Sequence, residues 1–385
     1  MLNREIEHVL KPELEAIGTA NVGRQERIRR WPVESGARVS LGPSNGKGVT
    51  QVMAVETLPL SPIEADLEAN LEKTVGYYDS IREFVDECVR TGLRNVYLVG
   101  AGGSLIASFP AFYLLHRMVE IPVFQLQSDE FNFGRPRALG PGSLVIIASY
   151  TGTTKETVAA ARYAREAGAT VFAACRAHSP LAEAATLAIE GGSDILELMA
   201  GYALCEALGV ELDYAAVRDA FTALPAAFRA AVEGAEPKVH DIAVALKDEP
   251  ITYVLGSGPS HGWAYGLAMC YLQEMQWKHA VSFNAGEFFQ GAFEVVREDT
   301  PVVLLLGEDP SRPIAERAQR FLDTYTKRAH YLDVRDLDLP GLTAEGRAIV
   351  SPLILPKVIG RLAKHYEAVR GHNLDQRRYM FRTVY

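Results

Sequence analysis

A loop rich in hydroxyl groups, Ser-Tyr-Thr-Gly-Thr-Thr-Lys-Glu-Thr at residues 149–157, is the part of this chain best suited to bind an anion. It follows the apolar run 144–148 and precedes an alanine-rich helical pattern, so we expect a strand, a loop and a helix. Hydroxyl and backbone N–H groups meet at such a helix N-terminus, where a phosphate is stabilised. The alternative is a well-capped helix with spare polar residues, although one cap does not need this many hydroxyls. The residues expected to bind the anion are Ser149, Thr151, Gly152, Thr153 and Thr154.

A second glycine-rich loop, residues 100–104, follows another apolar run at 95–99. Its Gly-x-Gly does not extend to Gly-x-Gly-x-x-Gly, because position 105 is leucine. Gln125 and Gln127 occupy the region where a dinucleotide-binding fold needs an acidic residue. Nicotinamide binding is therefore disfavoured, and we expect no cofactor. The loop remains suited to a phosphate or a sugar, through Gly102, Gly103 and Ser104.

Two motifs of the first half recur in the second half at almost the same offset. The Gly-x-Gly-x-Ser pattern of 100–104 returns at 256–260, which places Ser260 opposite Ser104. The Glu-Phe pair at 130–131 returns at 287–288, where it begins with Glu287. Two independent motifs at nearly one spacing indicate a duplicated αβ unit. Acidic residues replace the hydroxyl loop in the second copy, so we expect the first half to keep the anion site.

The composition is that of a globular enzyme. With 385 residues, of which 48% are hydrophobic and 23% charged, the chain can bury two cores of about 150 residues each. The net charge of -9 gives no general basic surface for nucleic acid. No apolar run approaches the roughly 18 residues of a membrane span, and the N-terminus lacks a signal-peptide core. The four scattered cysteines indicate thiols in a reducing cytoplasm, without a disulfide framework or a metal site.

Short apolar runs alternate with helical patterns, which is typical of parallel sheets with helices on both faces. We expect strands at 95–99, 121–126, 143–149, 170–174 and 187–190, then at 251–255, 279–283, 301–306, 329–333 and 347–350. Helices are expected at 64–91, 195–247, 263–277 and 352–369. The pattern predicts an α/β fold with two tandem, doubly wound parallel-sheet domains. The expected parts are an N-terminal extension at 1–62, a first domain at 63–198, a helical connection at 199–247, and a second domain with a C-terminal helix and tail at 248–385.

Over roughly residues 70–385 the chain resembles the double-SIS (sugar isomerase) family of phosphosugar enzymes. This family includes the isomerase domain of glucosamine-6-phosphate synthase and the fructosamine-6-phosphate deglycases. The loop 100–104 looks like the family's first substrate loop, and 149–154 looks like its Ser-x-Ser-Gly-x-Thr phosphate loop. The segments 274–277, 285–289, 293–295 and 378–385 are most similar to the deglycase branch. The resemblance implies a phosphorylated sugar ligand, contacts from Ser260 and Glu287, and a homodimer or larger oligomer.

Glu274 is the candidate base for proton transfer. It lies in an expected helix of almost entirely apolar residues, where a carboxylate is costly to bury unless it is paired. Such a group suits the transfer of a proton between C1 and C2 of an open-chain sugar, and in the family the matching glutamate does this. The alternative is a helix-end glutamate bonded to nearby backbone or to Lys278.

The chain departs from the family after the Glu-Phe segment. Relatives carry a His-Gly there that assists ring opening, whereas this sequence has Gln290-Gly291. A glutamine amide holds a hydroxyl but does not exchange protons near neutral pH. His372 in the tail is the first candidate to substitute, followed by His261 and His279; otherwise the substrate enters already open or the chemistry has changed.

Three functions remain open at this point. The first is a deglycase that splits a fructosamine 6-phosphate into a hexose 6-phosphate and an amine or amino acid. The second is an aldose–ketose isomerase or amino-sugar deaminase that acts on a sugar with a phosphate or sulfonate at C6. The third is a non-catalytic sugar-phosphate sensor, which has little reason to bury Glu274.

Overall fold

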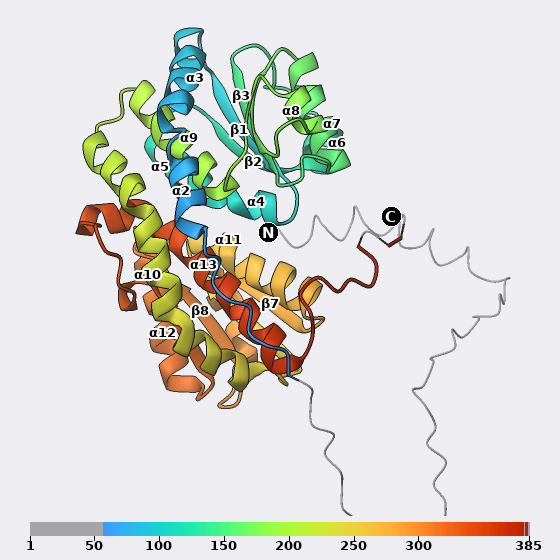
Figure 1. Ribbon diagram of the computed structural model, residues 1–385, viewed down its shortest axis with the longest axis vertical. Helices are drawn as coiled ribbons and strands as arrows, with labels where there is room; N and C mark the ends of the chain where they lie inside the picture. The colour runs from blue at the N-terminus through green and yellow to red at the C-terminus, as the bar shows by residue number, and fades with distance from the viewer. Residues whose placement is uncertain (1–56, 381, 384–385) are drawn as a thin grey trace, which may run out of the picture. The chain divides into compact units, whose positions relative to one another are not determined.

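The first sheet contains five parallel strands. The computed structural model describes residues 57–380 and 382–383, so positions 1–56 of the expected N-terminal extension lie outside the described residues. The strands are β1 (Asn95–Gly100), β2 (Val123–Gln127), β3 (Ser143–Ser149), β4 (Thr170–Cys175) and β5 (Leu187–Ile189). They are ordered β2-β1-β3-β4-β5 (Figure 1). Because the order reverses between β1 and β3, their carboxyl ends flank a crevice of the kind in which open α/β sheets bind ligands.

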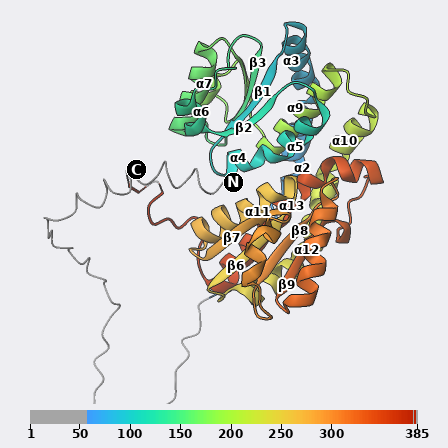
Figure 2. The same cartoon turned by 180° about the vertical axis from the view of Figure 1, so that it is seen from behind.

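The second sheet repeats this arrangement with four parallel strands. These are β6 (Ile251–Gly256), β7 (His279–Asn284), β8 (Val302–Leu306) and β9 (Ala329–Asp333). Their order, β7-β6-β8-β9, matches that of the first four strands of the first sheet (Figure 2). Gly102 and Gly258 even share an unusual backbone conformation, with φ, ψ of 55°, -128° and 51°, -129°. The α/β class, the parallel sheets and the duplication are thereby confirmed.

Helices cover both faces of the sheets. Around the first sheet they are α2 (Leu67–Val75), α3 (Tyr78–Arg90), α4 (Gly103–Ala107), α5 (Phe109–Met118), α6 (Ser128–Gly134), α7 (Lys155–Glu166), α8 (Pro180–Ala184) and α9 (Ser193–Ala207). The rest are α10 (Tyr214–Leu246), α11 (Pro259–Gly266), the π-helix η1 (Leu267–Met275), the 3₁₀ turns η2 (Glu287–Gln290), η3 (Ala292–Val295) and η4 (Val334–Asp336), α12 (Arg312–Tyr325) and α13 (Ala344–Arg370).

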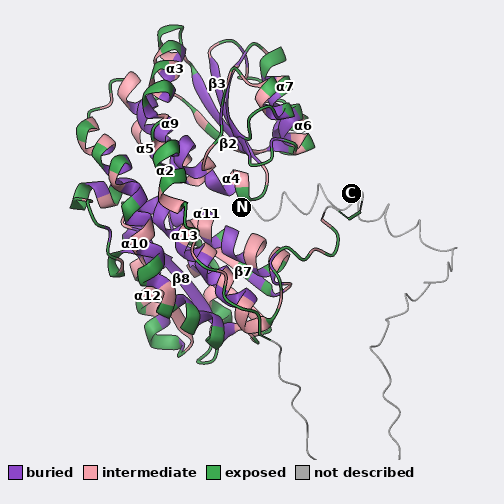
Figure 3. Cartoon of the chain, in the orientation of Figure 1, coloured by how far each residue is buried: buried purple, intermediate pink, exposed green. Residues whose placement is uncertain are grey.

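One large core joins the two halves. It contains buried side chains of both sheets together with α3, α5, α9, α10 and α13, and the long helices α10 and α13 pack against each other. Two smaller cores lie on the other faces, one between the first sheet and α7 and one between the second sheet and α12. Figure 3 shows the central strands β3 and β8 as buried, whereas the edge strand β7 is mostly half-buried or exposed. The boundaries proposed for the two domains and their connection remain a prediction.

The expected strand at 347–350 is wrong, because this segment lies inside α13. Thr343 begins the helix: its hydroxyl accepts a hydrogen bond from the Gly346 backbone N–H at 3.0 Å. Ile349 and Val350 are buried in the large core. A short apolar run of this kind does not distinguish a buried strand from one side of a buried helix.

Candidate active site

The hydroxyl-rich loop forms a tight turn between β3 and α7. The Ser149 and Thr154 side-chain oxygens lie 2.9 Å apart, and those of Thr151 and Thr153 lie 2.8 Å apart. Gly152 has a φ of +68°, and a Cβ atom there would come within 2.0 Å of the Ser179 hydroxyl oxygen. Only glycine therefore fits this position, and its carbonyl accepts a hydrogen bond from the Leu181 N–H at 3.0 Å.

The N-terminus of α7 is left open by this turn. Thr154 occupies the cap position but makes no side-chain hydrogen bond to the helix, because its hydroxyl faces Ser149. The first N–H groups of α7 therefore lack the side-chain cap that the alternative interpretation requires. Thr151 and Thr153 are exposed and Ser149 is buried. The arrangement of N–H groups and rotatable hydroxyls suits a phosphate.

The first glycine loop lies next to it, because β1 and β3 are paired neighbours. Gly102 and Gly103 are exposed, and a Cβ atom built on either would meet nothing within 4 Å. Ser104 is half-buried in the first turn of α4. The positive φ of Gly102 favours glycine, and the open space beside the loop leaves room for a ligand.

The second copy of this crevice is filled by its own side chains. Asp309 is 6% exposed, and its Oδ1 accepts hydrogen bonds from the Ser311 hydroxyl (2.6 Å) and backbone N–H (2.9 Å). A Cβ atom on Gly258 would come within 2.4 Å of the Ser311 hydroxyl oxygen. Ser260, expected to contact substrate, is 1% exposed, and its hydroxyl has no hydrogen-bond partner among the described residues. In the second half, the Asp309 carboxylate therefore occupies the place that is open in the first half.

Glu274 lies near the end of η1 and is held by the C-terminal tail. Its Oε1 forms an ion pair with Arg377 Nη2 at 2.9 Å, while the two side chains are 22% and 15% exposed. Lys278 does not pair with it, because the Lys278 ammonium donates to the carbonyl oxygens of Lys247 and Glu249. π-helical segments are rare and are frequently found at functional sites. Glu274 is therefore partly buried, paired, and still reachable from solvent.

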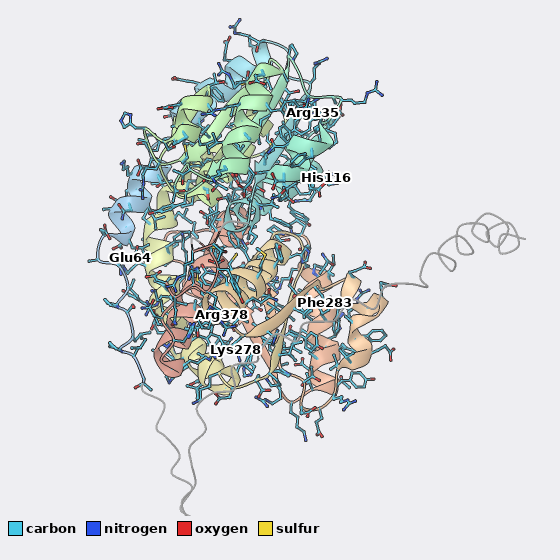
Figure 4. All side chains as sticks on the ribbon, turned by 90° about the vertical axis from the view of Figure 1, so that its right-hand side faces the viewer. Glu64, His116, Arg135, Lys278, Phe283 and Arg378 are labelled. Carbon is cyan, nitrogen blue, oxygen red and sulfur yellow. The ribbon has the colours of Figure 1, made fainter. Side chains whose placement is uncertain are left out.

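The tail is attached to the end of η1 by several polar contacts. Arg370 donates to the backbone and side-chain oxygens of Gln276, at 2.6 and 2.9 Å. The Gln276 amide in turn donates to the His372 carbonyl oxygen at 2.8 Å. The Arg378 guanidinium lies 4.0 Å from the centre of the Trp277 ring (Figure 4). These contacts place the residues around 372–378 beside Glu274.

His372 lies in this attached segment, with its ring 4.5 Å from that of Trp277. Burial lowers the pKa of His372, and the charges of Arg370 and Arg378 lower it further, against a hydrogen bond to the Met275 backbone. The imidazole is therefore neutral at neutral pH. Its Nε2 is buried and finds no hydrogen-bond partner within the described residues. Burial also lowers the pKa of His261, whereas His279 is exposed at the start of β7.

Glu287 and Gln290 lie apart from this cluster, on the η2 turn after β7. Both are exposed, and Asn284 Oδ1 fixes the turn by accepting hydrogen bonds from the N–H groups of Gly286 (2.8 Å) and Glu287 (3.3 Å). Neither side chain bonds to Glu274 in the described part of the chain. Their expected roles in the site remain predictions.

Sequence reasoning missed Arg377, Arg370 and Gln276. The tail carries arginines without any helical period, so only the unpaired carboxylate in an apolar helix signalled that a cation was needed. No group of three or more His, Cys, Asp or Glu among residues 57–380 and 382–383 is arranged to hold a metal. None of the helices within these ranges has the length and apolar character needed to cross a membrane.

Comparisons with known proteins identify the family of this chain. Residues 92–212 match the family model of the SIS domain. A fructosamine deglycase of Bacillus subtilis is 31% identical, over 79% of this chain and 97% of that protein. A fructoselysine 6-phosphate deglycase of Escherichia coli is 27% identical, over 78% of this chain and 89% of that protein. A crystal structure from Bacillus subtilis, assigned as a phosphosugar isomerase, has a TM-score of 0.75 at 29% identity, over 84% of this chain and 100% of that chain. Because the similarity extends through both sheets, the protein belongs to the SIS-domain family of sugar-phosphate deglycases and isomerases.

Proposed function

We propose that this enzyme is a deglycase, which splits a fructosamine 6-phosphate into a hexose 6-phosphate and an amine or amino acid. The observation that carries this proposal is the paired, partly buried Glu274 in a chain 31% identical to a fructosamine deglycase. The open loop at Ser149–Thr154 supports binding of the phosphate. A sensor without catalysis would not need a carboxylate held in this way.

The proposed reaction moves one proton from C1 to C2, moves a second from the amine nitrogen to the C2 oxygen, and adds one water. Glu274 removes a proton from C1 of the open-chain ketosamine while the C2 oxygen takes up a proton from water, and the C1–C2 enaminol forms. Return of the first proton to C2, with loss of the N–H proton to water, gives an imine between C1 and the amine nitrogen. Water adds to C1 of that imine, the C–N bond breaks, and the amine leaves with the free aldose 6-phosphate.

Arg377 orients the Glu274 carboxylate. Its Nη2 lies 2.9 Å from Oε1, and the carboxylate is 22% exposed, so it is both held in place and reachable from solvent. In the proposed reaction the guanidinium fixes the orientation of the carboxylate, which receives the proton. We assign proton transfer during ring opening to His372, in place of the histidine that Gln290 replaces; its Nε2 has no hydrogen-bond partner among the described residues and must become exposed for this step.

An aldose–ketose isomerase is the second candidate. Two observations favour it: Gln290 stands where relatives have a histidine, and two solved structures at 29% identity are assigned as phosphosugar isomerases. The two candidates share proton transfer by Glu274 and differ only in whether a C–N bond breaks.

NMR of the reaction in D₂O distinguishes these functions. The purified protein is incubated with a panel of fructosamine 6-phosphates and aldose 6-phosphates. We expect release of amine, with deuterium incorporated at C2 of the aldose product. Isomerised sugar without amine release would establish the second candidate instead, and absence of turnover and exchange with every substrate would contradict both.

Glu274→Gln tests the base directly. The variant keeps the shape of the side chain but removes the basic carboxylate, so kcat should fall by about 10²–10⁴-fold with little change in KM. Glu294→Gln, an exposed carboxylate on η3, is the matched control and should retain full activity. A fully active Glu274→Gln enzyme would exclude Glu274 as the base.

A further inference from the structure

A cavity of about 250 Å³ lies beside the loops of the second sheet. Pro259 after β6 and Asp309 and Pro310 after β8 form one wall, and α5, α9, α10 and α13 provide the others; these elements meet in the middle of Figure 2. The cavity therefore adjoins the β6–β8 reversal of strand order, just as the proposed phosphate loop adjoins the β1–β3 reversal. Such reversals are where parallel α/β sheets bind ligands.

The second crevice presents a hydrogen-bond acceptor, whereas the first presents hydrogen-bond donors. The Ser311 hydroxyl and N–H groups are already occupied by Asp309, so the loop has no donor left there for an external anion. Both hydrogen bonds go to Oδ1, and Oδ2 of this nine-tenths-buried side chain accepts none from the described residues. A carboxylate oxygen in that state is an acceptor for an ammonium group.

Arg117 places a positive charge at the same cavity. Arg117 on α5 is exposed and lies over the Tyr113 ring at 5.3 Å, but it forms no ion pair within the described residues. Two further acids line the cavity, and both lie at helix N-termini: Asp213 caps α10 through the Ala216 N–H at 3.0 Å, and Glu345 is in the first turn of α13. The helix dipoles offset part of their charge. Glu345 also makes no ion pair with the described residues, but it is exposed to solvent, whereas Asp309 is buried. Asp309 Oδ2 and the Arg117 guanidinium are therefore the two opposite charges that we assign to a ligand.

The remaining walls are mostly apolar. They are formed by Leu114, Leu198, Leu212, Val217, Ile349 and Pro352. For scale, an apolar cavity of roughly 150 Å³ admits benzene, so this one has room for a molecule with a branched aliphatic side chain. A ligand that satisfies all three features carries an ammonium, a carboxylate and an apolar body.

We propose that this cavity binds a free α-amino acid with an aliphatic side chain. The ammonium group contacts Asp309, the carboxylate contacts Arg117, and the side chain lies against the apolar walls. The site is separate from the phosphate loop of the first half, and its occupancy does not depend on which reaction the enzyme performs.

Calorimetric titration of the full chain with three related compounds tests this site. L-leucine carries both charges, isoamylamine is the same molecule without the carboxylate, and 4-methylpentanoate is the same molecule without the ammonium. Removing either charged group from the ligand should weaken binding by about tenfold or more, so leucine should bind tightest. Absence of heat with leucine at millimolar concentration, or equal binding of isoamylamine, would overturn the proposal.

Two variants locate the binding. Ala348→Phe fills the cavity from an exposed position on α13, and Arg117→Gln removes the carboxylate partner. We expect Ala348→Phe to abolish leucine binding and Arg117→Gln to weaken it by about tenfold or more. Ala245→Phe, at an exposed alanine of α10 outside the cavity, is the matched control and should bind as the parent protein does. Leucine binding that survives Ala348→Phe would contradict the assignment.

Discussion

Arg377 acts on the chemistry through another side chain, because its guanidinium holds Glu274 at 2.9 Å. Arg377→Met should leave Glu274 free to rotate and without its counter-charge. We expect kcat to fall by about tenfold or more, because the ion pair that orients the carboxylate is removed, while KM changes little. Steady-state kinetics with the substrate found by NMR measures both.

Partial recovery of kcat in a conservative variant would show that Arg377 positions Glu274 and does not only stabilise the fold. Arg377→Lys keeps the positive charge but not the planar guanidinium, so it should recover part of the lost kcat. Arg382→Gln, an exposed arginine further along the tail, is the control and should leave kcat unchanged. Equal activity of Arg377→Met and the parent enzyme would show that the pair does not assist proton transfer.

The phosphate loop can be tested at single hydroxyls. Thr151→Ala removes an exposed hydroxyl that pairs with Thr153, and Thr154→Val removes one that pairs with Ser149. A hydrogen bond to a charged group contributes about 1.5–3 kcal/mol, so each change should raise KM for a phosphorylated substrate by roughly 10- to 100-fold. Thr222→Ala on α10 is the control, since its hydroxyl bonds only to the Arg218 carbonyl. Unchanged KM in both loop variants would contradict the proposal that this loop binds the phosphate of the substrate.

At the scale of elements, the strands were predictable because their signals are local. Residues 143–149 and 329–333 are short apolar or β-branched runs bounded by turns, and β3 and β9 occupy these bounds. The run at 347–350 carried the same signal, yet Thr343 caps it into α13 and the large core buries one side of it. Packing in the tertiary structure decides whether such a run forms a strand or a helix, and the periodicity of the sequence carries no information about that packing.

The candidate site was predictable in its loops but not in its tail. A hydroxyl-rich turn at a helix N-terminus is encoded by adjacent residues, so the positions 149–154 were found from the chain alone. The pair between Glu274 and Arg377 joins residues about a hundred positions apart. The residues next to Glu274 in the sequence give no sign of this contact, because it depends on where the end of α13 places the C-terminal tail relative to η1.

Helix α9 buries a carboxyl group, Glu197, that makes the fold less stable as pH rises. Glu197 is 0% exposed, and neither carboxylate oxygen has a hydrogen-bond partner among the described residues. Burial, with a smaller effect of Asp194, raises the pKa of Glu197 well above its usual 4.5. The unfolded chain releases this proton near pH 4.5 while the folded protein retains it. Stability is therefore lost as pH rises from there toward the folded pKa.

Glu197→Gln should remove this dependence, because the amide is uncharged at every pH and nearly the same size. We expect its free energy of unfolding to exceed that of the parent at about pH 8, with the difference shrinking toward about pH 5. Urea denaturation at the two pH values measures it. Glu166→Gln, an exposed glutamate on α7, should show no such trend. A variant that is less stable than the parent at the higher pH would contradict a protonated Glu197.

At the scale of the whole molecule, the two halves share their strand order but differ in the crevice at the carboxyl ends of their strands. The first crevice is open and lined by hydroxyls, whereas Asp309 fills the second. Glu274 comes from the second half and the phosphate loop from the first, so neither half alone would carry the proposed reaction. Duplication followed by loss of one anion site accounts for this asymmetry.

Exposed aromatic side chains lie around the first crevice, where we expect a second copy of the chain to pack. Phe133 is 86% exposed and Tyr150 77%, and both lie beside the phosphate loop, with Phe124 on the edge strand β2 at 39%. By contrast, the aromatic segment 283–293 packs largely against Phe321 of its own chain. Exposed apolar clusters of this kind are typical of interaction surfaces.

We therefore expect a homodimer or a larger homo-oligomer, with the first crevice at the subunit contact. Light scattering at micromolar concentration should give at least twice the 42.2 kDa chain mass. Phe133→Ser should lower the measured mass and, because the partner then no longer covers the crevice, reduce turnover as well. Tyr325→Ser, which changes a 56% exposed aromatic side chain on α12 of the second half, should leave both unchanged. A monomer with full activity would show that the aromatic cluster serves another partner and that each chain completes its own site.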